Sequence, residues 1–149
     1  MSATKPEADI RAIQEAISRL TRDSRKAVIA DAGVVAPEIT PSAFVIMTRI
    51  VDEFPVSPAA IIAVTGFDRS VVSRQLATLA KEGYLVSEPD PHDGRVALFS
   101  PTADAAAKFG EVSKAKYGRV AEVVEDWSQQ DVSTFIMLLE RFEKSMYPS

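Results

Sequence analysis

The stretch SPAAIIAVTGFDRSVVSRQLATLAKEG, residues 57–83, contains two short helical patterns separated by only a few residues. Ser57, which precedes a proline, is typical of a helix start, and Gly66 stands where a glycine often ends a helix. Asp68 is placed to cap the second helix, and Gly83 closes it. Two helices joined by a tight turn with glycine predict a helix-turn-helix.

The second of these helices has one apolar and one polar face. Val72, Leu76 and Leu79 recur at i, i+4 and i+7, so we expect them to face the core. The polar face carries Arg69, Ser70, Ser73, Arg74 and Gln75. An ordinary solvated face is the alternative to a binding surface, and the neighbouring sequence decides between them.

A predicted β-hairpin follows directly. In YLVSEPDPHDGRVALFSPT, residues 84–102, two short runs rich in Val, Leu, Tyr and Phe flank a cluster of Pro, Asp and Gly. This pattern indicates a hairpin with a loop longer than two residues. The helix-turn-helix is therefore predicted to be winged, which favours DNA as the partner of the polar helix face.

The major groove of B-DNA admits one α-helix, whose N-terminal residues reach base edges. Arg74 is suited to a guanine and Gln75 to an adenine edge, and the wing loop with Arg95 near its tip is suited to the minor groove. The predicted DNA-binding residues are Arg69, Ser70, Val71, Ser73, Arg74, Gln75, His92, Gly94 and Arg95.

His92 is the only histidine of the chain, and carboxylates surround it in the wing loop. A metal site usually takes three or four convergent ligands, and an acid/base centre needs a pocket and a partner, so we expect neither. We expect Asp90 or Asp93 to pair with Arg95 as wing support, and the Asp93–Gly94 pair to form a turn. For His92, a DNA contact and plain exposure both stay open.

Helical patterns flank this region on both sides. Apolar residues recur at helical spacing over residues 7–31, until Gly33 and Pro37 interrupt the pattern. A second helix is expected to start at Thr40. A long helix is expected to start at Thr102, and its apolar stripe includes Val124 and Trp127. A final helix starts at a Ser128-x-x-Asp131 capping box. The apolar stripes of the first and last helices must pack against each other or against a second copy of the chain.

The bulk properties fit a single domain over residues 1–149. With no cysteine, the chain has no disulfide or thiolate metal site, and this agrees with a reducing cytoplasm. No apolar run reaches the roughly 18 residues of a membrane span, and the N-terminus lacks a signal-peptide pattern, so we expect a cytoplasmic protein. The net charge of −4 argues against nucleic acid, but residues 69–81 contain no acid and three basic residues.

Residues 38–105 resemble the DNA-binding region of the multiple-antibiotic-resistance regulator (MarR) family. The matching positions of its recognition helix and wing are Leu79, Gly83, Tyr84, Asp90, Asp93 and Arg95. The resemblance implies a mostly α fold with a small β-hairpin wing, in which 38–102 is the winged helix-turn-helix and the helices 6–34 and 103–147 of two subunits interleave. His92 stands where relatives often have arginine, and "PTADA" replaces the family's "L-T-x-x-G" after the wing.

The resemblance also implies a ligand cleft between the dimerisation helices and the winged region. We expect five large apolar residues to belong to the core, and the alternative is that they line such a cleft: Phe44, Met47, Phe54, Phe109 and Trp127. The ligand-binding residues themselves are unknown. We expect no cofactor, no metal and no membrane partner.

The expected function is that of a homodimeric, sequence-specific transcription regulator on a pseudo-palindromic operator in double-stranded DNA. We expect a repressor that a small, aromatic ligand releases. A winged-helix protein-interaction module without DNA binding is the alternative. A small hydrolase or metalloenzyme centred on His92 is a third, which the missing second histidine disfavours.

Overall fold

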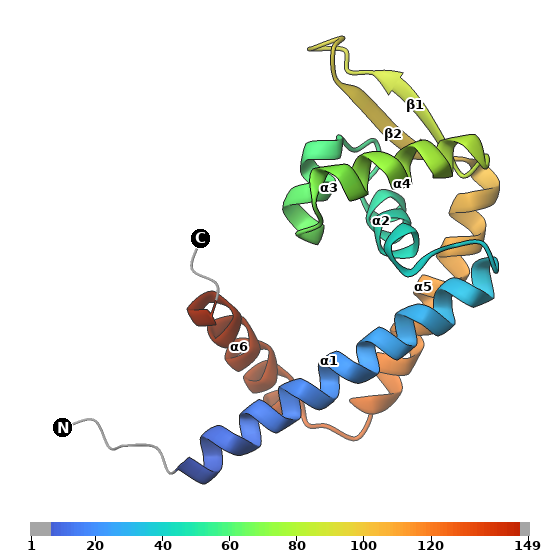
Figure 1. The fold of residues 1–149 in the computed structure, drawn as a ribbon. Coiled ribbons are helices and arrows are strands. Elements are labelled where there is room, and N and C mark those ends of the chain that lie inside the picture. Colours follow the sequence, from blue (N-terminus) through green and yellow to red (C-terminus); the bar gives the residue numbers. More distant parts are fainter. Residues whose placement is uncertain (1–6, 147–149) are drawn as a thin grey trace. The chain divides into compact units, whose positions relative to one another are not determined.

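The computed structural model describes residues 7–146, and these residues form six helices and one two-stranded sheet (Figure 1). In chain order they are α1 (Glu7–Val35), α2 (Pro41–Asp52), α3 (Pro58–Thr65), α4 (Arg69–Lys81), β1 (Leu85–Pro89), β2 (Ala97–Pro101), α5 (Ala103–Val123) and α6 (Gln129–Met146). The fold is mostly α-helical with a β-hairpin, as predicted. The outermost residues of the expected end helices, Pro6 and Tyr147, lie outside the described range.

The chain consists of two compact units, residues 1–112 and 113–149. The first unit holds α1 to α4, the hairpin and the first half of α5, and the second unit holds the rest of α5 and α6. None of the helices within residues 7–146 combines the length and apolar character needed to cross a membrane.

The helix starts in the first unit are those that the sequence predicts. Thr40, Ser57 and Asp68 each accept a hydrogen bond from a backbone N–H two or three residues further on, at 3.1, 3.2 and 2.7 Å. These side chains satisfy N–H groups that the first helical turn leaves without partners. Gly66 ends α3 at φ 67°, and Gly83 follows α4 at φ 80°. Both conformations are left-handed and favour glycine.

Two helix ends differ from what the local sequence pattern alone predicts. Helix α1 runs through Gly33 to Val35, because burial of Ala32 and Ala36 in the core holds its last turn against the modest cost of an internal glycine. Helix α5 ends at Val123 rather than continuing to Trp127, whose N–H instead donates to the Val124 carbonyl at 3.0 Å in a turn.

The core of the first unit surrounds α2, which packs against α1, α3, α4 and β2. Phe109, from the first half of α5, is completely buried, and its ring stacks on Phe44 at 5.7 Å and meets Tyr84 edge-on at 6.3 Å between centroids. Met47 is also completely buried. Of the five large apolar residues considered for the core, Phe44, Met47 and Phe109 belong to it. The other two, Phe54 and Trp127, are 54% and 40% exposed.

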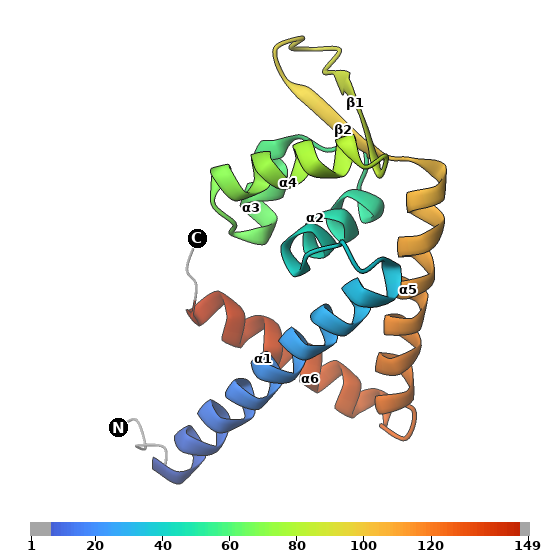
Figure 2. The ribbon, with the colours of Figure 1, turned by 45° about the vertical axis from the view of Figure 1, so that its right-hand side comes forward.

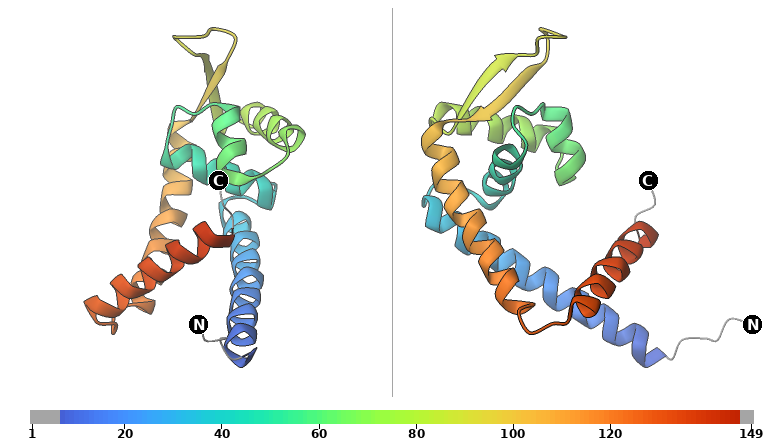
Figure 3. Two further views of the ribbon diagram at one scale, coloured as in Figure 1. Left: turned by 90° about the vertical axis from the view of Figure 1, so that its left-hand side faces the viewer. Right: turned by 180° about the vertical axis from the view of Figure 1, so that it is seen from behind.

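The hairpin projects beyond α3 and α4 (Figure 2 and Figure 3). Strands β1 and β2 are antiparallel, with Leu85 opposite Pro101 and Pro89 opposite Ala97. Val56, just before α3, forms two backbone hydrogen bonds with Phe99 of β2, at 2.9 and 3.0 Å. The base of the wing is therefore tied to the start of the helix-turn-helix.

In the second unit, the described residues of α6 include none that is buried. Trp127, in the turn before α6, meets Phe135 edge-on at 5.5 Å. The Ser128 cap of α6 forms as predicted, since the Asp131 N–H donates to Ser128 Oγ at 3.1 Å. The Asp131 carboxylate accepts the Ser128 hydroxyl at 2.6 Å, rather than the Ser128 backbone N–H that a capping box would supply. The large apolar side chains that α6 exposes are Phe135, Ile136, Met137, Leu138, Leu139, Phe142 and Met146.

Candidate nucleic-acid interface

Helix α4 presents its polar side to solvent. Val72, Leu76 and Leu79 are buried against the core, as their spacing predicts. Counting about 3.6 residues per turn, the side of α4 opposite to the core can be assigned from the sequence. The exposed residues that lie there are Ser70, Arg74, Ala77, Thr78 and Lys81. The predicted DNA contacts Ser70 and Arg74 are thus at the centre of the outward face.

Two other predicted contacts lie on one flank of α4. Arg69 and Ser73 are exposed but help to line a pocket of about 520 Å³ between α3, α4 and β2. Pro58 and Ile62 of α3 and Phe99 of β2 form its apolar wall. Arg69 and Ser73 therefore lie beside the outward face rather than at its centre.

On the opposite flank, Val71 and Gln75 are half-buried. The Thr40 hydroxyl, which caps α2, donates to Gln75 Oε1 at 3.4 Å. This bond joins the start of α2 to the middle of α4 across 35 residues of sequence. The Gln75 side chain therefore has an internal partner that sequence reasoning did not identify.

The N-terminus of α4 is capped by a carboxylate. Asp68 accepts a hydrogen bond from the Ser70 N–H at 2.7 Å. The hydrogen bonds from the Ser70 side chain and backbone lower the pKa of Asp68 below its ordinary value of 3.8. Because the charged carboxylate already satisfies this N–H, the end of α4 is less suited to phosphate than a bare helix N-terminus.

Two aspartates stabilise the wing loop, one through backbone N–H groups and the other through Arg95. The Asp90 carboxylate accepts hydrogen bonds from the N–H groups of His92, at 2.7 Å, and Asp93, at 3.4 Å. Asp93 pairs with Arg95, whose Nε lies 3.1 Å from Asp93 Oδ1. The Arg95 side chain remains 92% exposed. The structure thus assigns the pairing, which the sequence left open, to Asp93.

The electrostatics of this pair follow from its geometry. The hydrogen bond from the Arg95 side chain, with a second from the Arg95 backbone N–H at 3.1 Å, lowers the pKa of Asp93. The Asp93 carboxylate is therefore charged at neutral pH, and it holds one edge of the guanidinium, since Arg95 Nη2 also donates to Asp93 Oδ2 at 3.5 Å.

Gly94 and His92 are both exposed in the wing loop. Gly94 does not have a positive φ, and a Cβ added there would meet no atom within 4 Å, so the turn does not require glycine at this position. The His92 side chain is exposed. Within residues 7–146, no group of three or more His, Asp or Glu side chains is placed to hold a metal ion.

Three outward residues of α4 were not among the predicted contacts: Ala77, Thr78 and Lys81. Their position could have been found from the sequence, because Thr78 and Lys81 follow Arg74 at i+4 and i+7, on the same side of the helix.

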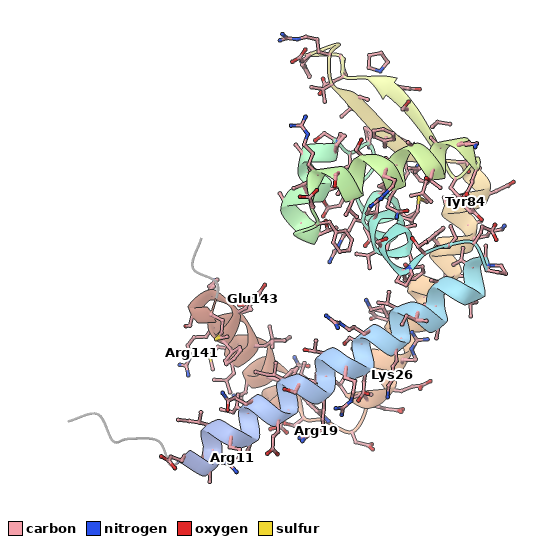
Figure 4. The ribbon with its side chains drawn as sticks, viewed as in Figure 1. Arg11, Arg19, Lys26, Tyr84, Arg141 and Glu143 are labelled. Carbon is pink, nitrogen blue, oxygen red and sulfur yellow. The ribbon has the colours of Figure 1, made fainter. Side chains whose placement is uncertain are left out.

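Some basic residues of α1 lie beside acidic residues of the same helix, unlike the basic residues of α4. Arg19 and Lys26 project from α1 (Figure 4), and each lies within 4 Å of an acid on the same helix. Arg19 pairs with Glu15 at 3.9 Å, and Lys26 pairs with Asp23 at 3.7 Å.

Tyr84, also labelled in Figure 4, connects α4 to the segment between α1 and α2. Its hydroxyl donates to Glu38 Oε1 at 3.2 Å, and its carbonyl accepts the Thr102 N–H at 3.0 Å. Burial, followed by the hydrogen bond to Glu38, raises the pKa of Tyr84. Tyr84 therefore joins the end of α4 to the segment between α1 and α2 and to the residue that precedes α5.

A second, largely apolar pocket of about 680 Å³ lies between α1 and the start of α2. Its lining residues are Leu20, Thr21, Ser24, Arg25, Val28, Ile29, Pro41, Ser42, Val45 and Phe67. None of the five large apolar residues considered for a ligand cleft is among them.

A helix-turn-helix with a wing, an outward polar helix face and an arginine at the wing tip defines the class of winged helix-turn-helix transcription regulators. The MarR family profile matches residues 38–96. Over 101 residues the chain is 30% identical to the HTH-type transcriptional regulator YxaD of Bacillus subtilis strain 168, a match that covers 67% of this chain and 71% of YxaD. The chain belongs to the MarR family, and it is a transcription regulator rather than an enzyme.

Solved structures of the family share the fold. A mutant MarR from E. coli, complexed with operator DNA, has a TM-score of 0.67 at 19% identity and covers 93% of this chain and 99% of its own. A MarR transcriptional regulator from Methanosarcina mazei Go1 has a TM-score of 0.71 at 18% identity, with 91% and 97% covered. The MarR family regulator SP03579 reaches 0.78 at 16% identity, with 93% of each chain covered.

Proposed function

We propose that this regulator binds a pseudo-palindromic operator in double-stranded DNA as a homodimer and represses transcription until a small ligand releases it. The observation that carries the proposal is the outward face of α4, which has no acid from residue 69 to 81 and lies next to a wing that presents Arg95. The E. coli relative complexed with operator DNA supports it.

The outward face of α4 supplies the base contacts. Arg74 is exposed at its centre and can donate two hydrogen bonds to a guanine, and Ser70 lies one turn earlier. Arg69, Val71, Ser73 and Gln75 border the face, where they contact the sugar–phosphate backbone or the rim of the groove. Such backbone contacts set position rather than sequence preference.

The wing supplies a second contact outside the major groove. Arg95, oriented by Asp93 and supported by the Asp90 turn, reaches the flanking minor groove or its phosphates. His92 and Gly94 accompany it there, so residues 38–102 act together as the DNA-binding region.

Exposed apolar helices support the homodimer. Ile10, Ile13, Ile17 and Leu20 form a stripe along α1 that remains exposed, and α6 exposes its whole apolar face. Soluble monomers rarely leave such large apolar surfaces in water, and a second copy of the same helices covers them best. We therefore assign dimerisation to the spans 6–34 and 103–147, whose outermost residues, 6 and 147, lie outside the described range.

The pocket of about 680 Å³ between α1 and α2 supports a ligand. Its volume lies in the range of small-molecule sites, and its apolar lining with Arg25 suits an aromatic acid. A ligand there shifts the regulator only if it binds the DNA-free and DNA-bound states with different affinity.

Operator selection from random DNA, with the purified full chain, tests the proposal directly. We expect an enriched palindrome with half-sites about one helical turn apart, and release in the presence of an effective aromatic acid. A protein-interaction module on the same fold would enrich no sequence, and it would have no need of an acid-free polar face on α4.

Two arginine variants then assign the contacts. Arg74→Ala is expected to weaken operator binding by about 1–3 kcal/mol and to relax the preference at one base pair, whereas Arg95→Ala weakens binding to all sequences and reduces its salt dependence. Lys108→Ala, which removes an exposed cation from α5, controls for net charge. Unchanged operator binding in both arginine variants would contradict the proposal.

A further inference from the structure

We propose that Thr78 is a specificity-determining residue that reads the methyl group of a thymine in each operator half-site. This inference rests on the proposed DNA binding and adds a base that none of the predicted contacts addresses. The reasons are the position of Thr78 on α4, the state of its hydroxyl and the chemistry of its neighbours.

Thr78 lies on the outward face of α4, on the side nearer to Gln75. It follows Arg74 by one helical turn, and both side chains are exposed. The flanks are occupied differently, since Gln75 accepts the Thr40 hydroxyl and Ser73 borders the pocket beside α3. A partner that contacts the outward face of α4 through Arg74 can therefore also contact Thr78.

The hydroxyl of Thr78 is not used within the helix. The hydroxyls of Thr21, Thr48 and Thr65 donate to backbone carbonyls three or four residues earlier, at 2.9, 2.8 and 2.7 Å. Among the described residues, Thr78 forms no such bond, and its backbone carbonyl accepts the Glu82 N–H at 2.9 Å. Its side chain is thus available to an external partner.

The chemistry of this part of α4 matches thymine. Thymine is distinguished in the major groove by its C5-methyl group and the O4 acceptor, and alanine or threonine methyl groups provide the apolar contact. Ala77 and Thr78 each place a small apolar group on the outward face, and both residues are exposed. Lys81, one turn further on, is suited to a phosphate that flanks this base pair.

The spacing along the helix predicts where the thymine stands. Arg74 and Thr78 are four residues apart, which is about 6 Å along the helix axis. Base pairs are spaced by about 3.4 Å, so this distance corresponds to roughly two base-pair steps. We therefore expect a thymine about two base pairs from the guanine that Arg74 contacts.

Replacement of single thymines by deoxyuridine in the selected operator tests the inference, because it removes only the C5-methyl group. For the wild-type chain, we expect about a fourfold loss of affinity per half-site at one thymine, the effect of exposing one methyl-sized group. Thr78→Ser removes the side-chain methyl and should bind the thymine and deoxyuridine operators equally at that position. Thr78→Val keeps the methyl and should retain the preference, and equal thermal melting of the three proteins shows that all fold.

The outcomes separate the inference from the function on which it rests. An enriched operator with no thymine-methyl effect, or a methyl effect that Thr78→Ser leaves unchanged, overturns the role of Thr78 while sequence-specific DNA binding stands. Enrichment of no sequence overturns both.

Discussion

Phe109 anchors the first half of α5 to the core of the winged region, and Phe109→Ala tests how much this anchor contributes. Its ring is completely buried and contacts the rings of Phe44 and Tyr84, at 5.7 and 6.3 Å between centroids. Truncation removes these contacts and leaves a cavity, so we expect the free energy of unfolding to fall by about 3–5 kcal/mol. Single domains are typically stable by about 5–15 kcal/mol, so the loss is a large fraction of the total.

Urea denaturation followed by circular dichroism measures this effect. The midpoint should fall while the slope stays constant, and the melting temperature should drop by roughly 6–20 °C for a chain of this size. Protein concentration must be the same for all variants, because an oligomer gains stability by mass action.

Val64→Ala is the control, because Val64 lies on α3 in the same unit as Phe109, outside the spans assigned to dimerisation, and is 56% exposed. We expect a change of about 0.5 kcal/mol or less for this variant. A loss below about 1 kcal/mol for Phe109→Ala, or equal losses for the two variants, would refute the anchoring role.

Three further predictions concern the turn of the helix-turn-helix and the wing. Gly66→Ala should destabilise the chain by about 1–2 kcal/mol in urea denaturation, because alanine is strained at φ 67°, whereas Gly94→Ala should have almost no effect; similar losses for both would contradict this reading. The pKa of Asp93 is lowered by its partner Arg95, so its contribution to wing order is present above pH 3.8 and is lost only as pH falls through the lowered pKa. In a carboxyl-detected NMR titration, Arg95→Ala should raise that pKa, and an unchanged value would show that the pair does not form in solution. If His92 lies near phosphates, operator affinity should increase from pH 8 to pH 6 in the wild type but not in His92→Ala; parallel profiles would remove this contact.

The parts of the fold that the sequence predicts are those set by local chemistry. A capping side chain or a left-handed glycine acts within three or four residues, so Thr40, Ser57, Asp68 and Gly66 could all be placed from the sequence. The end of α1 could not, because the burial of Ala32 and Ala36 depends on segments distant in sequence.

The same distinction between local and long-range signals applies to the residues of the candidate site. Periodicity places Arg74 on the outward face, and it would have placed Thr78 there too. The bond between Thr40 and Gln75 joins two helices and gives no local signal, so Gln75 was assigned to base contact without knowledge of its internal partner. Likewise, the choice between Asp90 and Asp93 as partner of Arg95 depends on the conformation of the loop, which the residue types alone do not determine.

Helix α6, none of whose described residues is buried, has a consequence for how the regulator responds to its own abundance. If a second copy covers this helix, folding of the C-terminal unit and assembly are one equilibrium, and its midpoint rises with the logarithm of protein concentration. At low expression the regulator then loses both its partner and the order of this helix. Operator occupancy should consequently rise more steeply than in proportion to the number of chains in the cell, so that a modest change in synthesis or degradation acts as a sharp control on the genes it regulates.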